Sequence, residues 1–132
     1  MAFTRPTVNT EISAADFGQP VYDLLTPTAW TNVTFQNSWA NMGGYQAVQY
    51  RKVGDMVQMR GMMGSGTMGQ TAFTLPVGFR PPALVMGSTG SYNTGSFTWV
   101  VARFDCNPDG RIVPIDGINQ YYVMLTSFSV TA

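Results

Sequence analysis

The chain has 132 residues, carries no net charge, and has only 11% charged residues, against about 25% in an average soluble domain. This length predicts a single domain with a substantial buried core, and the balanced charge excludes a protein that binds nucleic acid through a basic stripe. The lack of histidine removes the commonest general base and metal ligand, and the single cysteine excludes an intrachain disulfide.

The composition predicts β structure whose surface is partly hidden. Thr, Ser, Asn, Gln and Gly take the place of the missing charges, and the chain holds nine Met, three Trp, six Tyr and eight Phe. Aromatic residues and Met are enriched at subunit interfaces, where Lys and Glu are depleted, and this chain has one Lys and one Glu. The first residues lack the apolar region of a signal peptide, and no apolar run approaches about 18 residues, so we expect a soluble protein without membrane insertion.

Residues 1–26 are predicted to form an N-terminal arm ahead of a β domain at 27–132. Residues 1–12 are polar and threonine-rich, which is typical of an extended segment. The pattern from Ile12 to Phe17 matches a helix start with a capping residue at Ser13, but Pro20 prevents a continuous helix. We therefore expect one or two short helical turns in the arm.

The arm and the body carry opposite charges. Residues 1–26 hold Arg5 against Glu11, Asp16 and Asp23, a net charge of −2, and the remaining six basic and four acidic residues give +2. Such an arm is suited to dock on a neighbouring subunit or on a larger structure. The alternative is a terminal segment that packs on its own domain.

From residue 27 the chain shows short alternating runs joined by glycine- and proline-rich turns. Loops are expected at 37–44, which contains Trp39, at 61–69, and at the polar segment 88–96 around Tyr92. Because no helical stripe follows the arm, this organisation predicts an all-β fold, an antiparallel β-sandwich or jelly roll. The expected strands are 28–35, 46–52, 55–63, 72–75, 83–86, 97–105, 111–115 and 121–131.

The clearest local pattern lies at residues 45–82. Two alternating runs flank Val53-Gly54-Asp55, which predicts a tight β-hairpin because glycine enters the required positive-φ region without a steric cost. The stretch 73–82 then combines Leu75-Pro76, a glycine and a double proline, which predicts a short strand that ends in a rigid corner.

The last predicted strand, 121–131, is apolar on both faces. A lone antiparallel sandwich exposes one face of each sheet to water, so the second apolar face predicts contact with another subunit. We assign that contact to Tyr122, Met124 and Phe128. The alternative is an edge strand covered by the N-terminal arm.

No group of residues predicts catalysis. Asp105 and Asp109 lie four residues apart across a turn, which offers no cleft for a glycosidase reaction. The lone Cys106 has no histidine to activate it, and the glycine cluster 61–69 lacks the lysine of a phosphate-binding loop. We expect no enzyme, no catalytic residue, no metal site and no cofactor.

Three aromatic residues in or beside predicted loops are candidates for contact with a ligand or partner. Trp39, Tyr45 and Tyr92 lie among Asn, Gly and Ser residues. Aromatic faces with amide and hydroxyl neighbours suit a sugar, whose apolar C–H face stacks while its hydroxyls form hydrogen bonds. The same residues suit packing or a subunit interface, and the pattern alone favours the protein contact.

Residues 50–61 and 73–82 resemble a module common in virion proteins of tailed bacteriophages. The module is the C-terminal β domain of many minor tail and receptor-binding proteins, and its most specific piece is Leu-Pro-x-Gly-aromatic-Arg-Pro, here Leu75–Pro81. Trp30, the segment 107–112 and the final aromatic strand follow in the corresponding order, so the resemblance covers about residues 28–130.

The resemblance implies a homotrimeric, non-enzymatic β domain exposed on a virion and synthesised in the cytoplasm of a bacterial host. The arm is expected to attach the domain to other virion proteins of the capsid or tail. The side chains expected to make that attachment are Phe3, Arg5, Ile12, Phe17, Tyr22 and Leu25.

Two roles fit this resemblance. Family members usually carry the domain at the end of a much longer chain, whereas 26 residues precede it here, which favours a protein that decorates or stabilises the capsid surface. The alternative is a receptor-binding protein at the tail tip that recognises carbohydrate on the host surface. In that role Trp39, Tyr45 and Tyr92 are the expected glycan contacts.

Overall fold

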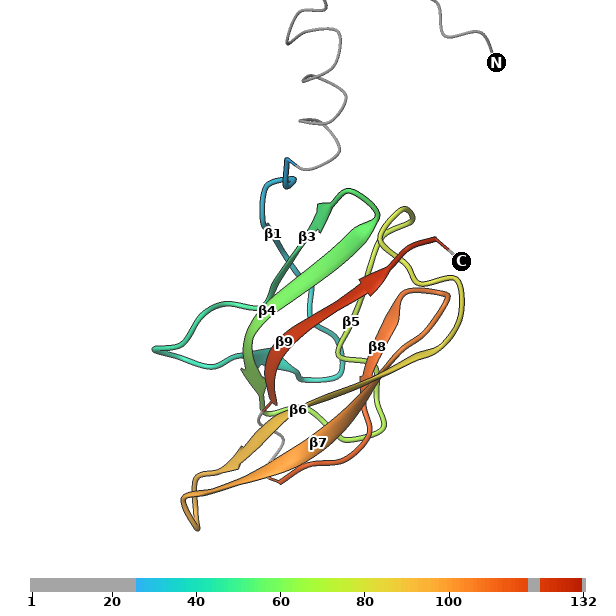
Figure 1. Ribbon diagram of the computed structural model, residues 1–132. Helices are drawn as coiled ribbons and strands as arrows, with labels where there is room; N and C mark the ends of the chain where they lie inside the picture. Colours follow the sequence, from blue (N-terminus) through green and yellow to red (C-terminus); the bar gives the residue numbers. More distant parts are fainter. Residues whose placement is uncertain (1–25, 119–121, 132) are drawn as a thin grey trace, which may run out of the picture.

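Antiparallel β-strands form the regular structure of residues 26–118 and 122–131, which are the residues that the computed structural model describes (Figure 1). The all-β prediction is therefore confirmed for these residues. The predicted helical turns and the arm residues Phe3, Arg5, Ile12, Phe17, Tyr22 and Leu25 lie outside the described part of the chain. The strands are β1 (Thr31–Asn32), β2 (Ala40–Asn41), β3 (Gln49–Val53), β4 (Met56–Gly64), β5 (Phe73–Thr74), β6 (Val85–Asn93), β7 (Thr98–Cys106), β8 (Arg111–Pro114) and β9 (Tyr122–Ser129).

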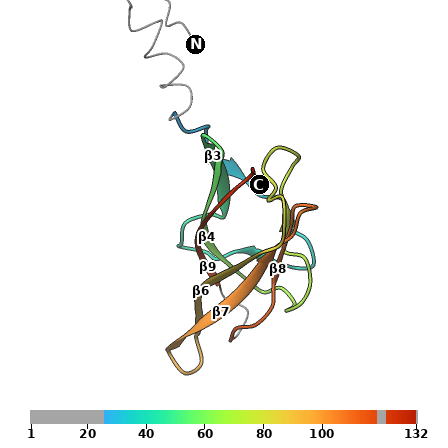
Figure 2. The same cartoon turned by 45° about the vertical axis from the view of Figure 1, so that its right-hand side comes forward.

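Hydrogen bonding joins the strands into one continuous sheet. Its order is β1-β3-β4-β9-β6-β7-β8-β5, and β2 pairs separately with β4. The two ends of this order meet, because Phe35 forms an antiparallel bridge with Phe73 and the Gln36 amide donates to the carbonyl of Ala72 at 2.8 Å. The two layers of the expected sandwich are thus opposite sides of one curled sheet, with β3, β4 and β9 facing β8 (Figure 2).

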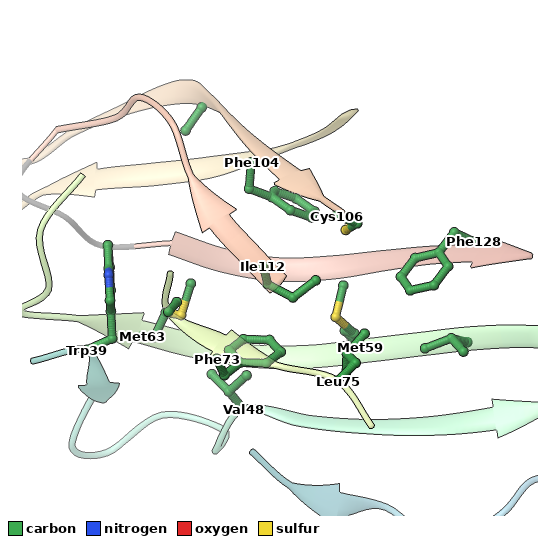
Figure 3. Close-up of a cluster of buried hydrophobic side chains, with 13 residues drawn as sticks. Trp39, Val48, Met59, Met63, Phe73, Leu75, Phe104, Cys106, Ile112 and Phe128 are labelled. Carbon is green, nitrogen blue, oxygen red and sulfur yellow. The ribbon is translucent and has the colours of Figure 1, made fainter. Parts of the chain in front are cut away.

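The core lies between these two sides. Alternate residues of β4 and β7 point inward, which buries Val57, Met59, Phe104 and Cys106. In Figure 3 these inward side chains meet those of β5, β8 and β9 in one cluster. Phe73 and Phe35 pack edge to face at 6.2 Å, so the same contact that closes the sheet also fills the core.

The predicted hairpin of residues 45–63 is confirmed. β3 and β4 pair from Gln49↔Arg60 to Val53↔Met56, and Gly54 in the connecting turn has a φ of 60°. Glycine is favoured at this angle because a side chain would crowd the adjacent carbonyl. Residues 61–69 are only partly a loop, since β4 continues to Gly64.

The segment Leu75–Pro82 forms the rigid corner expected from its prolines and glycine. The Phe79 amide donates to the carbonyl of Pro76 at 3.1 Å, and Gly78 has a φ of 94°, as a type II turn requires. The Arg80 Nε atom donates to the carbonyl of Leu75 at 2.8 Å, which ties the two ends of the corner together.

This corner is also fixed to both of its neighbours. The Leu75 amide donates to the carbonyl of Gly110 in the β7–β8 turn at 2.9 Å. The Phe79 ring packs against Tyr50 of β3 at 5.1 Å, and the Lys52 ammonium lies 5.1 Å from the same ring. The corner is therefore in direct contact with both the β3–β4 hairpin and the β7–β8 turn.

The segment 88–96 differs from its prediction as a polar loop. It forms most of β6, which pairs with β7 over nine residues from Val85↔Cys106 to Asn93↔Thr98. The expected strand at 83–86 is the first part of this longer strand. At the other end of the domain, the strand expected at 28–35 is reduced to Thr31–Asn32 and the bridge at Phe35.

Candidate functional site

Trp39 is not an exposed loop aromatic, and this expectation is wrong. Its side chain is 3% exposed and belongs to the core cluster (Figure 3). Asn37 and Ser38 both have positive φ values, and this turn directs the next residue inward. Gly66 makes room for the indole, since a Cβ atom at that position would collide with the ring. Trp39 is therefore structural and does not contact a glycan.

Tyr45 and Tyr92, the other two predicted contact residues, lie on separate elements. Tyr45 is 59% exposed in the segment between β2 and β3. Tyr92 lies near the end of β6 and is half-buried, because its ring contacts that of Trp99 at 4.8 Å. The structure thus leaves Tyr45 available and gives Tyr92 an aromatic neighbour that the sequence did not single out.

The predicted subunit interface on β9 is wrong at Phe128. This side chain is 5% exposed and packs in the domain's own core opposite Val57, so it cannot also contact another subunit. Tyr122 and Met124 pair through their backbones with Met63 and Gly61, and their side chains lie outside the described part of the structure. An interface on this strand stays a prediction for those two residues.

The carboxylates near the β7–β8 turn are held by arginines rather than facing a cleft. Asp105 accepts two hydrogen bonds from the Arg103 guanidinium, at 2.9 and 3.0 Å. Asp109 accepts one from the Arg111 guanidinium at 2.7 Å and one from the Arg111 backbone amide at 3.1 Å. The hydrogen bond from Arg111 lowers the pKa of Asp109, and the bond to Asp105 raises the pKa of Arg103. Each of the two carboxylates is thus engaged in an ion pair with a nearby arginine of its own hairpin.

Residues 26–118 and 122–131 hold neither a metal-ligand cluster nor a membrane-spanning helix. In these residues, no three side chains among Cys, Asp and Glu come together in a way that could hold a metal ion. No helix in the same part of the chain has the length and hydropathy needed to cross a membrane.

The face of the β6–β7 hairpin that points away from the core holds the strongest candidate site. We call it the β6–β7 outer face. The register places four pairs on it: Tyr92↔Trp99, Gly90↔Val101, Ser88↔Arg103 and Met86↔Asp105. The alternate positions Ala102, Phe104 and Cys106 face the core and are buried.

Trp99 is the central residue of this face. Its indole is 58% exposed, and a Cβ atom at position 90 would lie 3.2 Å from two of its ring carbons. Gly90 therefore lets the indole lie close to the backbone of β6, while Tyr92 supports it from the side. An open hollow of about 350 Å³ adjoins the ring and is lined by Ser88, Thr89, Gly90, Trp99, Val100 and Val101.

The β6–β7 hairpin exposes apolar residues at the hollow and elsewhere along its length. Val101 is 83% exposed, and Phe97 and Met86 are 78% and 63% exposed. Within the described residues, the cation on this face is Arg103, which pairs with Asp105. A face with large apolar side chains and no unpaired charge of its own is suited to a neutral ligand or to another protein surface.

The sequence contains a signal for this exposed apolar face in residues 97–105. Residues 97–105 are apolar at Phe97, Trp99 and Val101 as well as at the inward positions, so the strand is apolar on both faces. The same two-faced pattern was recognised only in the last strand. Applied to residues 97–105, it would have placed an exposed apolar surface where the structure has one.

Comparison with known proteins shows similarity in fold. No protein-family model matches the sequence, and no curated protein matches it. Among solved structures, the receptor binding protein gp15 of Listeria phage PSA has a TM-score of 0.69 at 16% sequence identity, over 89% of this chain and 73% of that chain. The head domain of the lactococcal phage bIL170, described among receptor binding domains, has a TM-score of 0.59 at 15% identity, over 78% of this chain and 98% of that chain.

These similarities show that the fold is one found in phage receptor-binding domains. They agree with the β domain of phage virion proteins that residues 50–61 and 73–82 resemble. At this level of identity, the comparison establishes the fold and leaves the function to be argued from the site.

Proposed function

We propose that the chain is a non-enzymatic domain of a bacteriophage virion that binds carbohydrate on the host surface through the hollow beside Trp99. The observation that carries this proposal is an exposed indole, with Ser88 beside it, on the outer face of a receptor-binding fold. Receptor binding was the alternative to capsid decoration, and both structural neighbours favour it.

The hollow has the chemistry that a sugar ring needs. A pyranose presents apolar C–H groups on its faces and hydroxyls around its rim. An exposed indole stacks on such a face, and hydroxyl and backbone groups at the side of the hollow bond the rim. The volume of about 350 Å³ is at the lower end for ligand pockets, which suits one or two sugar units of a longer polymer.

The position of the hairpin supports a role in recognition. The described chain begins at one end of the domain, and the tip of the β6–β7 hairpin lies at the opposite end (Figure 1). If residues 1–26 attach the domain to the particle, the hairpin tip is directed away from the attachment. We propose that the domain acts as a homotrimer in which Met86, Phe97 and Val101 make the subunit contact, and that the hollow beside Trp99 opens at the edge of that contact.

Binding of the purified full chain to an array of bacterial cell-surface polysaccharides tests this function. We expect Trp99→Ala to weaken binding about five- to tenfold, because stacking on an exposed aromatic contributes about 1–1.5 kcal/mol and has no substitute in the hollow. Tyr45→Ala is the matched control, since its ring is 59% exposed against 58% for Trp99 and lies on a different element.

Two outcomes would contradict a glycan site beside Trp99. Equal binding of the Trp99→Ala variant and the wild type would reject the hollow as the site. Loss of binding in Tyr45→Ala alone would move recognition to the segment between β2 and β3. Chain mass measured by light scattering on both variants separates a loss of the ligand site from a loss of assembly.

A further inference from the structure

A second surface, on the outer side of β1, β3 and β4, holds two arginines around one tryptophan. Trp30 comes directly before β1, which pairs with β3 through Thr31↔Tyr50. The guanidinium carbons of Arg51 and Arg60 lie 4.4 and 4.0 Å from the centre of its ring. We call these three residues the Trp30 surface. Both cations lie within the distance at which the negative face of an indole attracts them.

Neutral glutamines orient these arginines without compensating their charge. The Arg51 Nε atom donates to Gln58 at 2.8 Å, and the Arg60 Nε and Nη2 atoms donate to Gln49 at 3.0 and 2.6 Å. In residues 26–118 and 122–131, no carboxylate oxygen lies within 4.0 Å of either guanidinium. Both guanidiniums are therefore oriented by neutral side chains and have no anionic partner in the described structure.

The carboxylates of the described chain are engaged elsewhere. Asp105 and Asp109 pair with Arg103 and Arg111. Asp55 accepts a hydrogen bond from the Thr131 hydroxyl at 2.9 Å, and Asp116 accepts one from the backbone amide of Arg103 at 2.6 Å. The remaining acidic side chains of the sequence are Glu11, Asp16 and Asp23, all within residues 1–25, where Arg5 is the one basic residue.

The described chain begins beside the Trp30 surface. The Thr28 amide donates to the carbonyl of Lys52 at 2.8 Å, and the Lys52 amide donates to the Thr28 hydroxyl at 2.9 Å. Residues 26–30 therefore run along β3 directly beside Arg51. Asp23 precedes Trp30 by seven residues, a separation that spans at most about 25 Å, so its carboxylate has the reach to meet either arginine.

We propose that the Trp30 surface is the docking site for the acidic segment 11–23 of the same chain. The arginines, preoriented by Gln49 and Gln58, pair with carboxylates of that segment and hold the arm against the outer side of β3 and β4. Exposed ion pairs are weak singly, but two oriented guanidiniums on one surface bind a segment with three carboxylates more firmly than isolated pairs do. The contact is independent of host binding.

Hydrogen exchange of the full chain tests this docking. At low salt we expect amides of residues 11–23 to exchange about fivefold faster in the Arg51→Gln/Arg60→Gln variant than in the wild type, as loss of one or two exposed ion pairs predicts. The variant Glu11→Gln/Asp16→Asn/Asp23→Asn leaves the β domain intact and should give the same acceleration. Combining both sets should add nothing further, since each removes the same interaction. High salt should abolish the difference.

Arg111→Gln is the matched control, because it removes one positive charge from an arginine that pairs with Asp109. Equal acceleration in this variant would show a net-charge effect and overturn the proposal. Unchanged exchange of residues 11–23 in the arginine variant would overturn it as well. Protection that appears only as protein concentration rises would assign the contact to a neighbouring copy, which contradicts docking within one chain.

Discussion

Cys106 shows how burial alone determines the chemistry of a residue. It is the last residue of β7, it has no exposed surface, and the neighbouring Asp105 pairs with Arg103. Burial, and to a smaller extent the charge of Asp105, raises the pKa of the thiol from 9.0 to about 12. The thiol therefore stays protonated and unreactive at neutral pH, because the thiolate is the nucleophilic form.

This shift predicts a loss of stability in alkali. In the unfolded chain the thiol ionises above its ordinary pKa of 9.0, whereas in the folded chain it keeps its proton up to about pH 12. Between pH 9 and about pH 12 the folded state thus binds one more proton than the unfolded state. The stability of the fold therefore falls as the pH rises through this range. We expect this group alone to lower the free energy of unfolding by about 1.4 kcal/mol per pH unit above pH 9.

Urea unfolding of the wild type and of Cys106→Ala between pH 8 and pH 11 measures this slope. The variant lacks the thiol and is otherwise identical, so the difference between the two slopes isolates the contribution of Cys106. The Cys106 thiol should also react with DTNB only after the protein has been unfolded. Parallel slopes, or rapid native labelling, would contradict a protonated and buried thiol.

Among the elements, the Leu75–Pro82 corner depends on a glycine that lies far from it in the sequence. Gly110 has a φ of 90°, and a Cβ atom there would collide with the carbonyl oxygen of Leu75 and with the Arg80 guanidinium. A side chain would both strain the backbone of the β7–β8 turn and push the corner away. The hydrogen bond from the Leu75 amide to the Gly110 carbonyl would then be lost.

We predict that Gly110→Ala lowers the free energy of unfolding by about 3 kcal/mol or more. Gly44→Ala is the matched control, because Gly44 has a φ of 82° and no atom within 4 Å of an added Cβ. The Gly44→Ala variant therefore has the strain of a positive φ without a steric clash, and this strain costs about 1 kcal/mol. Chemical denaturation of both variants measures the difference, and equal losses would show that the corner does not pack on Gly110.

The elements that the sequence predicted well are those that local chemistry determines. Gly54 and the alternating runs around it define the β3–β4 hairpin, and Pro76 with Gly78 defines the corner, since each of these residues restricts the backbone by itself. Both were recognisable before any tertiary contact was known.

β6 was not recognisable because tertiary pairing overrides its local preferences. Gly, Ser and Thr at 87–91 are turn-forming residues, yet they form a strand between β7 and β9. Small residues are needed there for packing. A Cβ atom at Gly87 would collide with the Phe104 ring, and Ser91 is fully buried while its hydroxyl exchanges hydrogen bonds with the backbone of Ile118.

The candidate site was missed for the same reason. Tyr92 was assigned to a loop, so its pairing with Trp99 across two strands could not be inferred. Trp39 was assigned to the surface because Asn and Gly surround it, whereas the left-handed turn at Asn37 and Ser38 directs it into the core. Both errors come from reading polar neighbours as a sign of exposure.

At the scale of the whole molecule, the proposed trimer requires a surface that only association would cover. The most exposed apolar side chains of the β6–β7 hairpin are Val101, Phe97 and Met86. Isolated apolar residues are normal on any protein, but several on one sheet face are typical of an interface. The corner has an equally exposed residue, Val77, at 82% against 83% for Val101, which lies alone on a turn.

We therefore predict that Val101→Glu dissociates the assembly and that Val77→Glu does not. A carboxylate forced into an apolar contact costs about 3 kcal/mol per subunit, so the dissociation constant should rise at least a hundredfold. Light scattering should show the wild type and Val77→Glu at three times the 14.4 kDa chain mass, and Val101→Glu at the mass of one chain. A wild type that stays monomeric at high concentration would reject the trimer. Dissociation by Val77→Glu alone would instead place the interface at the corner.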